Sequence, residues 1–526
     1  MSGISGIYRI NQHPIDPRNI HNMLGTLSHR GPDGSDIWCE GAIGLGHCML
    51  LTTPESLTEQ LPLVERELVI TADARIDNRE ELLLALGRSK DLVEPISDSQ
   101  IILASYEKWG EKCVSKLVGA FAFAIWDKAH QKLFCARDHM GIKPFYYFYQ
   151  PDSFFAFASE IKALLCLSQV PKQLNEVRIG DYLALVIDDK ITTSYKNILR
   201  LAPAHSMVFG SSLDPVLHPQ SYWALDPNVE IRLNSDEEYC AEFRRIFTEA
   251  VRCRLRSAFP LGSQLSGGLD SSSVTCVAKD LLSSLGTDTL HTISVIFDDV
   301  SECDERSFIQ PVLEKGDLTP HYIYGDRSSP LSDIDTILPH EDEAYLGPNH
   351  FYPWIANRTA KELGLRVVLD GFDGDTTVSH GTARLTELAQ LGQWPELIQE
   401  VKAIAQQHQV PSHRIIQQFG FPYLHTLLKQ GNGIAFAKAE RLIHKTFGTS
   451  RRKLILNYGL RPIWKQLKQS INCTKSPCHS LPSLVNAKFF KDSNFDKRLN
   501  ALASPKESPK TLRQEHWQKL THWILP

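Results

Sequence analysis

The sequence predicts an α/β protein with two domains, an antiparallel one followed by a parallel one. Its 526 residues are enough for two hydrophobic cores, or for three. Residues 1–212 contain short apolar segments of strand length separated by turns, whereas residues 235–526 begin with apolar segments that alternate with helical ones. The first pattern favours antiparallel sheets with helices packed outside, and the second favours a doubly wound parallel sheet.

The first domain is predicted over residues 1–212. Strands are expected where apolar residues alternate or run together, at Ile4–Ile10, Ala42–Met49, Leu68–Ala72, Ala120–Asp127 and Phe154–Ala158. Two helices are expected, at Asn78–Leu86 and at Asp98–Trp109, where apolar residues recur at helical spacing. Because short turns join consecutive strands, we expect neighbouring strands to run antiparallel.

A linker is predicted at residues 213–234, which are rich in Pro, Asp, Ser and Asn, and the second domain at residues 235–526. Ser235 caps a helix expected from Asp236 to about Ser257, because its first turn is acidic and its last turn basic. Strands are then expected at Leu261–Leu265, Leu290–Phe297, His321–Tyr324 and Arg366–Asp370. The helices between them are expected at Ser271–Leu282, Glu305–Lys315 and Phe351–Gly364, and the pattern beyond Thr382 is helical.

The composition excludes several classes of partner. A net charge of −5 gives no reason to expect nucleic acid. No apolar segment approaches the length of a membrane span and the N-terminus has no signal-peptide pattern, so we expect no membrane partner and a cytoplasmic location. The 11 cysteines include no Cys-x-x-Cys pair, which favours reduced thiols. The basic segment Lys438–Lys475, with Glu440 as its only acidic residue, is interpreted as a solvated face, with a binding surface as the alternative.

The segment QLSGGLDSS, from Gln264 to Ser272, is the most informative in the chain. It places two glycines and a helix N-terminus at the carboxyl end of a predicted parallel strand, where backbone amides bind anions. It lacks the Gly-x4-Gly-Lys of ATPases that transfer the terminal phosphate, and it looks like the loop of enzymes that split ATP into AMP and pyrophosphate. The residues expected to bind ATP are Leu265, Ser266, Gly267, Gly268, Asp270, Ser271 and Ser272, with Asp270 also holding magnesium.

Together with this loop, four other segments resemble the asparagine synthetase family, and the resemblance covers nearly the whole chain. They are Leu27–Gly34 (LSHRGPDG), Gly119–Ala124 (GAFAFA), Arg137–Tyr147 (RDHMGIKPFYY) and Phe157–Leu164 (FASEIKAL). The resemblance implies an N-terminal αββα, Ntn-hydrolase-like glutamine amidotransferase domain. It also implies a C-terminal ATP-pyrophosphatase domain of the adenine nucleotide alpha hydrolase-like type, with ATP and Mg²⁺ as cofactors.

The residues that the family uses to hydrolyse glutamine are altered here. The nucleophilic cysteine is replaced by Ser2, which its own amine could still activate. Met49 stands where the family has an arginine that holds the glutamine carboxylate, and Asp73–Ala74 stand where an Asn-Gly pair stabilises the oxyanion. Only Asp98 is retained among the glutamine-contacting positions. An aspartate opposes a developing negative charge, so we expect an inactive glutaminase that persists as a structural partner.

A second segment, Leu369–Gly381, corresponds to the family's other ATP-binding stretch. Asp370 and Gly371 are expected at the nucleotide, and Asp375 as the second magnesium ligand beside Asp270. Phe372 and Thr376 replace two glutamates, one of which serves ammonia capture in the family. This version of the segment looks most like the lasso-peptide cyclases.

The resemblance also nominates residues around the adenine and the substrate. Ser294, Val295 and Phe297 are expected to line the adenine pocket. Asp342 and Glu343, like Phe372, are expected near the substrate. For the two acidic residues a solvated acidic loop is an equal alternative.

These observations leave three hypotheses for the function. The first is a lasso-type macrolactam cyclase that adenylates a peptide carboxylate and works with a leader peptidase. The second is an asparagine synthetase that uses aspartate and free ammonia, and the third is a non-catalytic protein that binds ATP or a peptide. We also expect the C-terminal part to be incomplete, because Lys453, Lys465 and Lys519 lack the context of the family's catalytic lysine.

Overall fold

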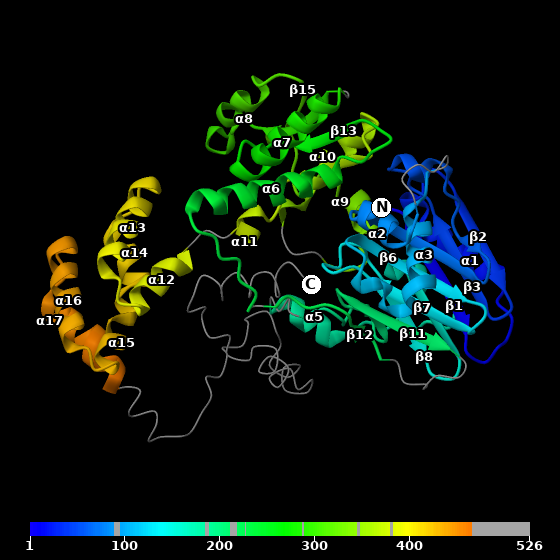
Figure 1. The fold of residues 1–526 in the computed structure, drawn as a ribbon, viewed down its shortest axis with the longest axis horizontal. Coiled ribbons are helices and arrows are strands. Elements are labelled where there is room, and N and C mark those ends of the chain that lie inside the picture. Colours follow the sequence, from blue (N-terminus) through cyan, green and yellow to red (C-terminus); the bar gives the residue numbers. More distant parts are fainter. Residues whose placement is uncertain are drawn as a thin grey trace. The chain divides into compact units, whose positions relative to one another are not determined.

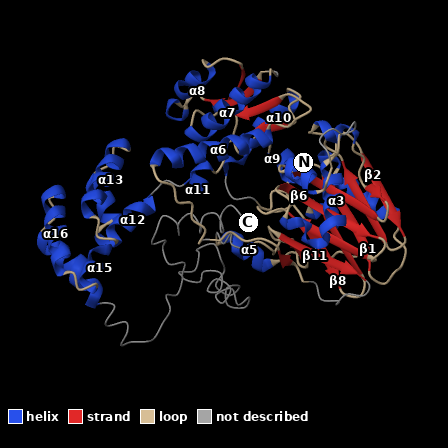
Figure 2. Cartoon of the chain, viewed as in Figure 1, coloured by secondary structure: helices blue, strands red, loops and turns tan. Residues whose placement is uncertain are grey.

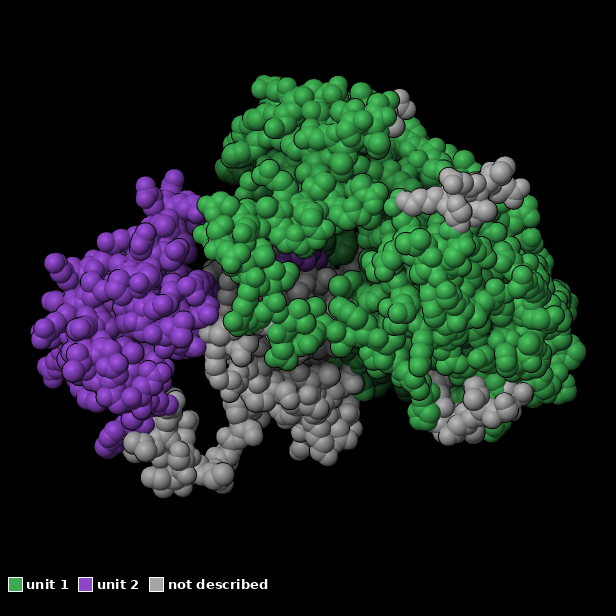
Figure 3. Space-filling model, viewed as in Figure 1, with its two compact units in different colours: residues 1–372, 525–526 green, residues 373–524 purple. Residues whose placement is uncertain are grey.

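The computed structural model describes residues 1–88, 95–184, 189–210, 218–226, 228–286, 289–344, 348–378 and 382–464 (Figure 1). These residues fall into two compact units, one over residues 1–372 and one that begins at Asp373 (Figure 3). Both predicted sheet regions lie in the first unit. The predicted boundaries of the domains and of the linker at 213–234 stay a prediction.

Two antiparallel sheets form the N-terminal part of the first unit (Figure 2). The first sheet has the order β10-β8-β9-β1-β3-β2, with bounds Ile198–Arg200, Tyr146–Gln150, Phe154–Ala158, Gly3–Arg9, Ile43–Cys48 and Ser35–Glu40. The second has the order β12-β11-β7-β6-β5-β4, with bounds Gln220–Ser221, His205–Gly210, Lys132–Arg137, Gly119–Asp127, Leu68–Ile76 and Leu63–Glu65.

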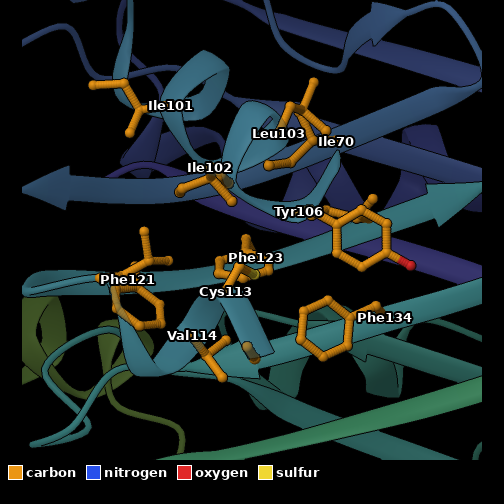
Figure 4. Close-up of a cluster of buried hydrophobic side chains, with 14 of the residues drawn as sticks. Ile70, Ile101, Ile102, Leu103, Tyr106, Cys113, Val114, Phe121, Phe123 and Phe134 are labelled. Carbon is orange, nitrogen blue, oxygen red and sulfur yellow. The ribbon is translucent and has the colours of Figure 1, made fainter. Parts of the chain in front are cut away.

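Helices cover the outer face of each sheet. α1 (Pro17–Thr26) and α4 (Ile161–Leu165) pack on the first sheet, and α2 (Arg79–Ala85) and α3 (Asp98–Trp109) lie on the side of the second. α5 (Glu176–Leu183) follows in the chain. Figure 4 shows the buried cluster beneath α3, where isoleucines of the helix meet aromatic side chains of the strands. The predicted αββα arrangement is therefore confirmed.

The sequence of β6 is apolar almost throughout because both faces of the strand are buried. Phe121 and Phe123 belong to the cluster under α3, whereas Ala122 and Ala124 belong to the cluster between the two sheets. Successive side chains of a strand point to opposite faces, and both faces of β6 are buried. Over residues 121–124 the phenylalanines fill the space below the helix and the alanines face the other sheet, which Trp126 also contacts further along β6.

A four-stranded parallel sheet forms the rest of the first unit. Its order is β15-β14-β13-β16, with bounds Leu318–Tyr324, Leu290–Ile296, Leu261–Gln264 and Val367–Leu369. The chain runs outward from β13 to β15 and then returns to the other side of β13, which is the doubly wound order that we predicted. The switch point between β13 and β16 is where such sheets bind ligands.

The helices of this sheet are α6 (Asp236–Arg254), α7 (Leu269–Leu285), α8 (Arg306–Leu313), α9 (Ile334–Ile337) and α10 (Phe351–Glu362). The Ser235 hydroxyl accepts a hydrogen bond from the Glu238 amide, so this residue caps α6 as expected. Among the described residues, no helix combines the length and the apolar character that crossing a membrane requires.

The second unit is helical, as the pattern beyond Thr382 predicted. Its helices are α11 (Gly374–Val378), α12 (Thr382–Gln390), α13 (Trp394–Gln407), α14 (Ser412–Phe419), α15 (Leu424–Lys429), α16 (Gly433–Phe447) and α17 (Arg451–Lys453). Glu440 is buried in α16, and its carboxylate accepts hydrogen bonds from Arg451 at 2.7 and 3.0 Å. The lysines and arginine of α16 at 438, 441 and 445 are exposed, which fits a solvated face and a binding surface equally.

Candidate functional site

The chain turns sharply between β13 and α7. Gly267 has a φ of +87°, and a Cβ there would lie 2.9 Å from the Cβ of Phe308. Gly268 is the N-cap of α7, with extended φ and ψ of −65° and 161°. Both conformation and space therefore require glycine at 267, and the turn leaves the N-terminus of the 17-residue helix α7 open.

Serine and threonine side chains hold this turn. The Ser271 hydroxyl accepts a hydrogen bond from the Ser266 amide at 3.2 Å and lies 3.0 Å from the Ser266 hydroxyl. Thr275, one turn further along α7, donates to the Ser271 carbonyl at 2.8 Å and lies 2.8 Å from the hydroxyl of Ser263 in β13. Strand, turn and helix are thus joined by side-chain hydrogen bonds.

The turn has the features of an anion site. The Ser272 hydroxyl is buried and has no hydrogen-bond partner among the described residues, so a ligand oxygen would satisfy it. The helix N-terminus adds a positive partial charge. Asp270 is half-buried in the first turn of α7 and is placed to hold a cation beside such an anion.

The end of β16 meets the same turn. A Cβ at Gly371 would lie 2.5 Å from the amide nitrogen of Ser271, so the two backbones are in contact there. The Asp370 carboxylate accepts a hydrogen bond from the Phe372 amide at 3.1 Å, and the Phe372 side chain is 83% exposed. The structure therefore brings the two predicted nucleotide segments together, as far as Phe372, at the switch point of the sheet.

The predicted magnesium pair is not tested by these contacts. Asp270 lies in the first unit and Asp375 lies in α11 of the second. Within the described ranges, no three His, Cys, Asp or Glu side chains gather into a metal cluster. The pair of magnesium ligands stays a prediction.

The adenine candidates lie at the end of β14. The Ser294 hydroxyl donates to the Leu265 carbonyl at 2.6 Å, so it holds the first residue of the turn. Val295 and Phe297 are half-buried. The Phe297 ring packs against Gly325, where a Cβ would lie 2.5 Å from the ring. The centres of the Phe297 and Tyr352 rings are 6.2 Å apart. Contact of these residues with adenine stays a prediction.

Asp342 and Glu343 contact the N-terminal sheets. Asp342 accepts hydrogen bonds from the amides of Ile161 and Lys162 at the start of α4, and burial raises its pKa. Glu343 accepts from the amide and the hydroxyl of Ser194, at 2.7 and 2.8 Å, and pairs with Arg200. A role in substrate binding, still a prediction, would compete with these contacts.

The predicted vestigial site is a cavity of about 300 Å³ lined by Ser2, Met49, Asp73, Ala74 and Asp98, among others. The Ser2 hydroxyl accepts a hydrogen bond from the Leu50 amide at 3.1 Å. Met49 and Ala74 pack against the cluster under α3. All the residues nominated for this site therefore lie together.

Asp73 is paired with a lysine that the sequence reasoning missed. The Lys143 ammonium lies 2.7 Å from the Asp73 carboxylate, and the two side chains are only 12% and 7% exposed. Burial opposes the charge on Asp73, but Lys143 and the N-terminal amine outweigh it and lower its pKa. Burial also lowers the pKa of His47, in the same cavity, to about 4. Lys143 belongs to the segment RDHMGIKPFYY, which carries the family resemblance, but nothing in that segment indicates its contact with Asp73.

Asp98 is fully engaged by two arginines. Arg256 donates to it at 2.7 and 3.3 Å, Arg79 donates to the same carboxylate, and the Ile76 amide donates at 3.2 Å. Glu55 lies beside both arginines, at 3.3 and 3.5 Å. Each Asp98 oxygen therefore has two protein donors.

Replacing Asp73 by Asn should destabilise the fold at neutral pH. The change leaves the Lys143 ammonium buried without a counter-charge, which costs about 3 kcal/mol. Because the folded-state pKa of Asp73 is lowered, its contribution is present above the unfolded pKa of about 3.9 and lost as the pH falls further. Urea unfolding at pH 7 and pH 3 measures this difference, which should shrink at pH 3.

Asp152→Asn is the matched control for this change. Asp152 is exposed and has a φ of +58°, which Asn adopts readily. It should unfold like the unchanged protein at both pH values. Equal stabilities of Asp73→Asn and Asp152→Asn at pH 7 would contradict the importance of the Asp73–Lys143 pair.

Comparison with known proteins adds independent findings. A family model described as a glutamine amidotransferase domain matches residues 1–223, and one described as asparagine synthase matches residues 242–455. Glutamine-hydrolyzing asparagine synthetase 3 of Bacillus subtilis is 32% identical over 318 residues, which are 59% of this chain and 50% of that protein.

Two further relatives extend the comparison. A putative glutamine-hydrolyzing asparagine synthetase 2 of Methanocaldococcus jannaschii is 29% identical over 71% of this chain and 74% of its own length. Amidase chry2 of Gibberella zeae is 29% identical over 60% of this chain and 48% of its own length. The chain thus spans about half the length of the Bacillus and Gibberella relatives.

Proposed function

The chain belongs to the asparagine synthetase family, and on that premise we propose that it is an ATP-dependent ligase that adenylates a carboxylate and then forms an amide bond. The observation that carries the proposal is the contact between the turn before α7 and Gly371 at the switch point of the parallel sheet. Parallel sheets of this order bind nucleotides at that place.

In this proposal the residues of the turn bind the phosphates. The amides at the start of α7 and the Ser272 hydroxyl donate to phosphate oxygens, and Ser271 keeps the turn in shape through Ser266. Asp270 and Asp375 would hold Mg²⁺, which when bound neutralises the charge of the departing pyrophosphate. The substrate carboxylate attacks the α-phosphorus of ATP, pyrophosphate leaves, and an amine then displaces AMP from the acyl-adenylate.

The amine in this proposal does not come from glutamine. The Asp73 carboxylate stands at the place of an oxyanion donor and is held by Lys143. Asp98 is occupied by Arg79 and Arg256, so it has no free oxygen for the ammonium group of an amino acid. Both features oppose glutamine binding and hydrolysis.

Our first candidate is a lasso-type macrolactam cyclase in the cytoplasm, acting on a peptide that a leader peptidase has cut. The peptide's N-terminal amine would attack the adenylate of a side-chain carboxylate. The exposed Phe372 supports this candidate, because it stands where the family has a glutamate and offers no carboxylate for the capture of ammonia. Holding both ends of one peptide together can supply about 7–11 kcal/mol of the barrier.

The second candidate is an asparagine synthetase that uses aspartate and free ammonia. The names of the Bacillus and Methanocaldococcus relatives favour it. Lys453 lies in the short helix α17, whereas Lys465 and Lys519 lie outside the described residues. A catalytic role for any of these lysines stays a prediction.

ATP–pyrophosphate exchange distinguishes the candidates. We expect exchange that depends on a carboxylate substrate, with aspartate and peptides bearing an N-terminal amine tested in parallel. A peptide product lighter by one water supports the cyclase, and ammonium-dependent asparagine supports the synthetase. Glutamine should release no ammonia under any of these conditions. Absence of exchange with every substrate would reject both enzymes and favour a non-catalytic binder.

A further inference from the structure

The two strands that carry the nucleotide segments are short. β13 and β16 pair only through Leu261–Val367, Gly262–Val368 and Ser263–Leu369. A shift of one residue would separate Gly371 from Ser271 and reverse the faces of the strand. Contacts at the other ends of these strands therefore bear on the geometry of the nucleotide site.

Arg366 directly precedes β16 and contacts the N-terminal sheets. Its guanidinium donates two hydrogen bonds to the Asp33 carboxylate, and the one from Nη2 to Oδ1 is 2.8 Å long. The guanidinium also donates to the Leu51 carbonyl at 3.0 Å. The hydrogen bond from Arg366 lowers the pKa of Asp33. The guanidinium also lies 4.1 Å from the centre of the Phe259 ring, in the segment that leads into β13.

Arg256 makes similar contacts ahead of β13, although the segment 257–260 separates it from the strand. It lies between the end of α6 and the start of β13, and its guanidinium contacts Asp98, Glu55 and the Ile76 carbonyl. Two residues later, the Ala258 amide donates to the Thr52 carbonyl at 2.9 Å. The chain entering β13 is thus held to the N-terminal sheets by an ion pair and by a backbone hydrogen bond.

We propose that Asp33 and Asp98 are positioning residues for the nucleotide site, acting through Arg366 and Arg256. The two ion pairs hold the amino ends of β16 and β13 in one register, and their carboxyl ends then bring Gly371 against the turn before α7. Asp98, which the resemblance assigns to glutamine, serves here as the partner of an arginine from the other part of the same unit. Only the measurement of nucleotide binding rests on the proposed function; the measurement of hydrogen exchange in the loop does not.

The geometry of the Asp33–Arg366 and Asp98–Arg256 ion pairs is suited to positioning the two strands. Arginine makes two hydrogen bonds in a fixed plane, so each pair sets direction as well as distance. All four side chains are largely buried, with exposed fractions of 26% for Arg366, 15% for Asp33, 19% for Arg256 and 7% for Asp98. Burial limits screening by salt. The N-terminal part thereby has a role in the reaction that needs no glutamine.

The test measures the loop and the ligand separately. Variants Arg256→Met and Arg366→Met are compared by hydrogen exchange of the amides at 265–272 and by binding of α,β-methylene-ATP with Mg²⁺. We expect faster exchange in this loop and binding weaker by about tenfold or more, at temperatures where both variants are folded. The control is Arg245→Met, which removes an exposed pair with Glu242 on α6 and should change neither quantity.

A reciprocal exchange tests whether the pair itself matters. Asp33→Arg with Arg366→Asp should recover part of the binding and of the slow exchange that either single change loses, because the ion pair returns while the contacts with the Leu51 backbone stay lost. If a methionine variant fails to fold, Arg366→Lys, which keeps one charged donor, replaces it and should give an intermediate loss. Unchanged exchange and binding in the single variants, or no recovery in the double variant, would overturn the positioning role. If the unchanged protein binds no nucleotide, the proposed function fails, and the loop exchange alone decides this inference.

Discussion

A Gly371→Val variant should lose nucleotide binding almost completely while its fold persists. A Cβ at this position would lie 2.5 Å from the Ser271 nitrogen and 2.8 Å from the Asp270 carbonyl carbon. Both atoms are backbone at the start of α7, so they cannot rotate away as a side chain would. Either Gly371 or the turn must move, and we expect the affinity for α,β-methylene-ATP to fall about 100-fold or more.

The matched control is Gly25→Ala in α1. A Cβ at Gly25 meets no atom within 4 Å, and helix formation favours Ala over Gly. This variant should bind nucleotide normally and melt at the same temperature or slightly higher. Isothermal titration and thermal unfolding measure both properties. Normal binding by Gly371→Val would show that the two segments do not form one nucleotide site.

An Asp270→Asn variant should lose ATP–pyrophosphate exchange by about a thousandfold, because the change removes a negative charge and a metal ligand without changing shape. Asp270 lies in the first turn of α7, where its charge also favours the helix. We therefore expect a small loss of stability and a large loss of activity. Raising the Mg²⁺ concentration should recover part of the activity, because weaker metal binding is overcome by mass action.

Asp280→Asn provides the control on the same helix. The Asp280 side chain is 74% exposed and pairs with its neighbour Lys279, at 3.3 Å. Exchange by this variant should match that of the unchanged protein at every Mg²⁺ concentration. Full exchange by Asp270→Asn would refute the magnesium assignment, whether or not Asp375 is its partner.

Much of the fold could be predicted because it depends on local patterns. Phe154–Ala158 and Asp98–Trp109 were predicted with the bounds that the structure has, since both segments are apolar on the faces that they bury. Leu68–Ala72 was predicted too short, because Asp73 and Arg75 interrupt its apolar run although β5 continues to Ile76. The charge of Asp73 is neutralised by Lys143, a partner distant in the sequence that a local pattern does not reveal, whereas Arg75 lies 3.7 Å from the nearby Asp77.

Other elements escaped prediction for the same reason. Helix α1 begins at Pro17 behind the capping Asp16, but its sequence is largely polar and only its buried side carries a signal. Strand β2 has no fully buried residue, so its alternation is weak. Short segments of this kind are specified by the sheet that they join rather than by their own propensity.

In the candidate site, too, the residues with a local signal could be predicted and those with distant partners could not. The nucleotide segments could be found because glycine and serine at a strand–helix turn have a local chemical reason. The contacts of Asp342 and Glu343 could not, because their partners lie more than a hundred residues away in the sequence. Arg256 and Arg366, which engage Asp98 and Asp33, are likewise distant in sequence. Charge complementarity between distant segments has no periodicity from which to predict it.

The alternation of phenylalanine and alanine at residues 121–124 of β6 also determines how this part of the strand can change in evolution. Phe121 and Phe123 face a helix, which can shift as a body to accommodate a different side chain. Ala122 and Ala124 face a second sheet, and an added methylene there would push two sheets apart. Substitutions should therefore be tolerated at the two phenylalanines, whereas a substitution at either alanine should require a compensating change in the facing sheet. Because β5 pairs with β6 and carries Asp73, selection on the small residues would act through the pocket as well as through the core.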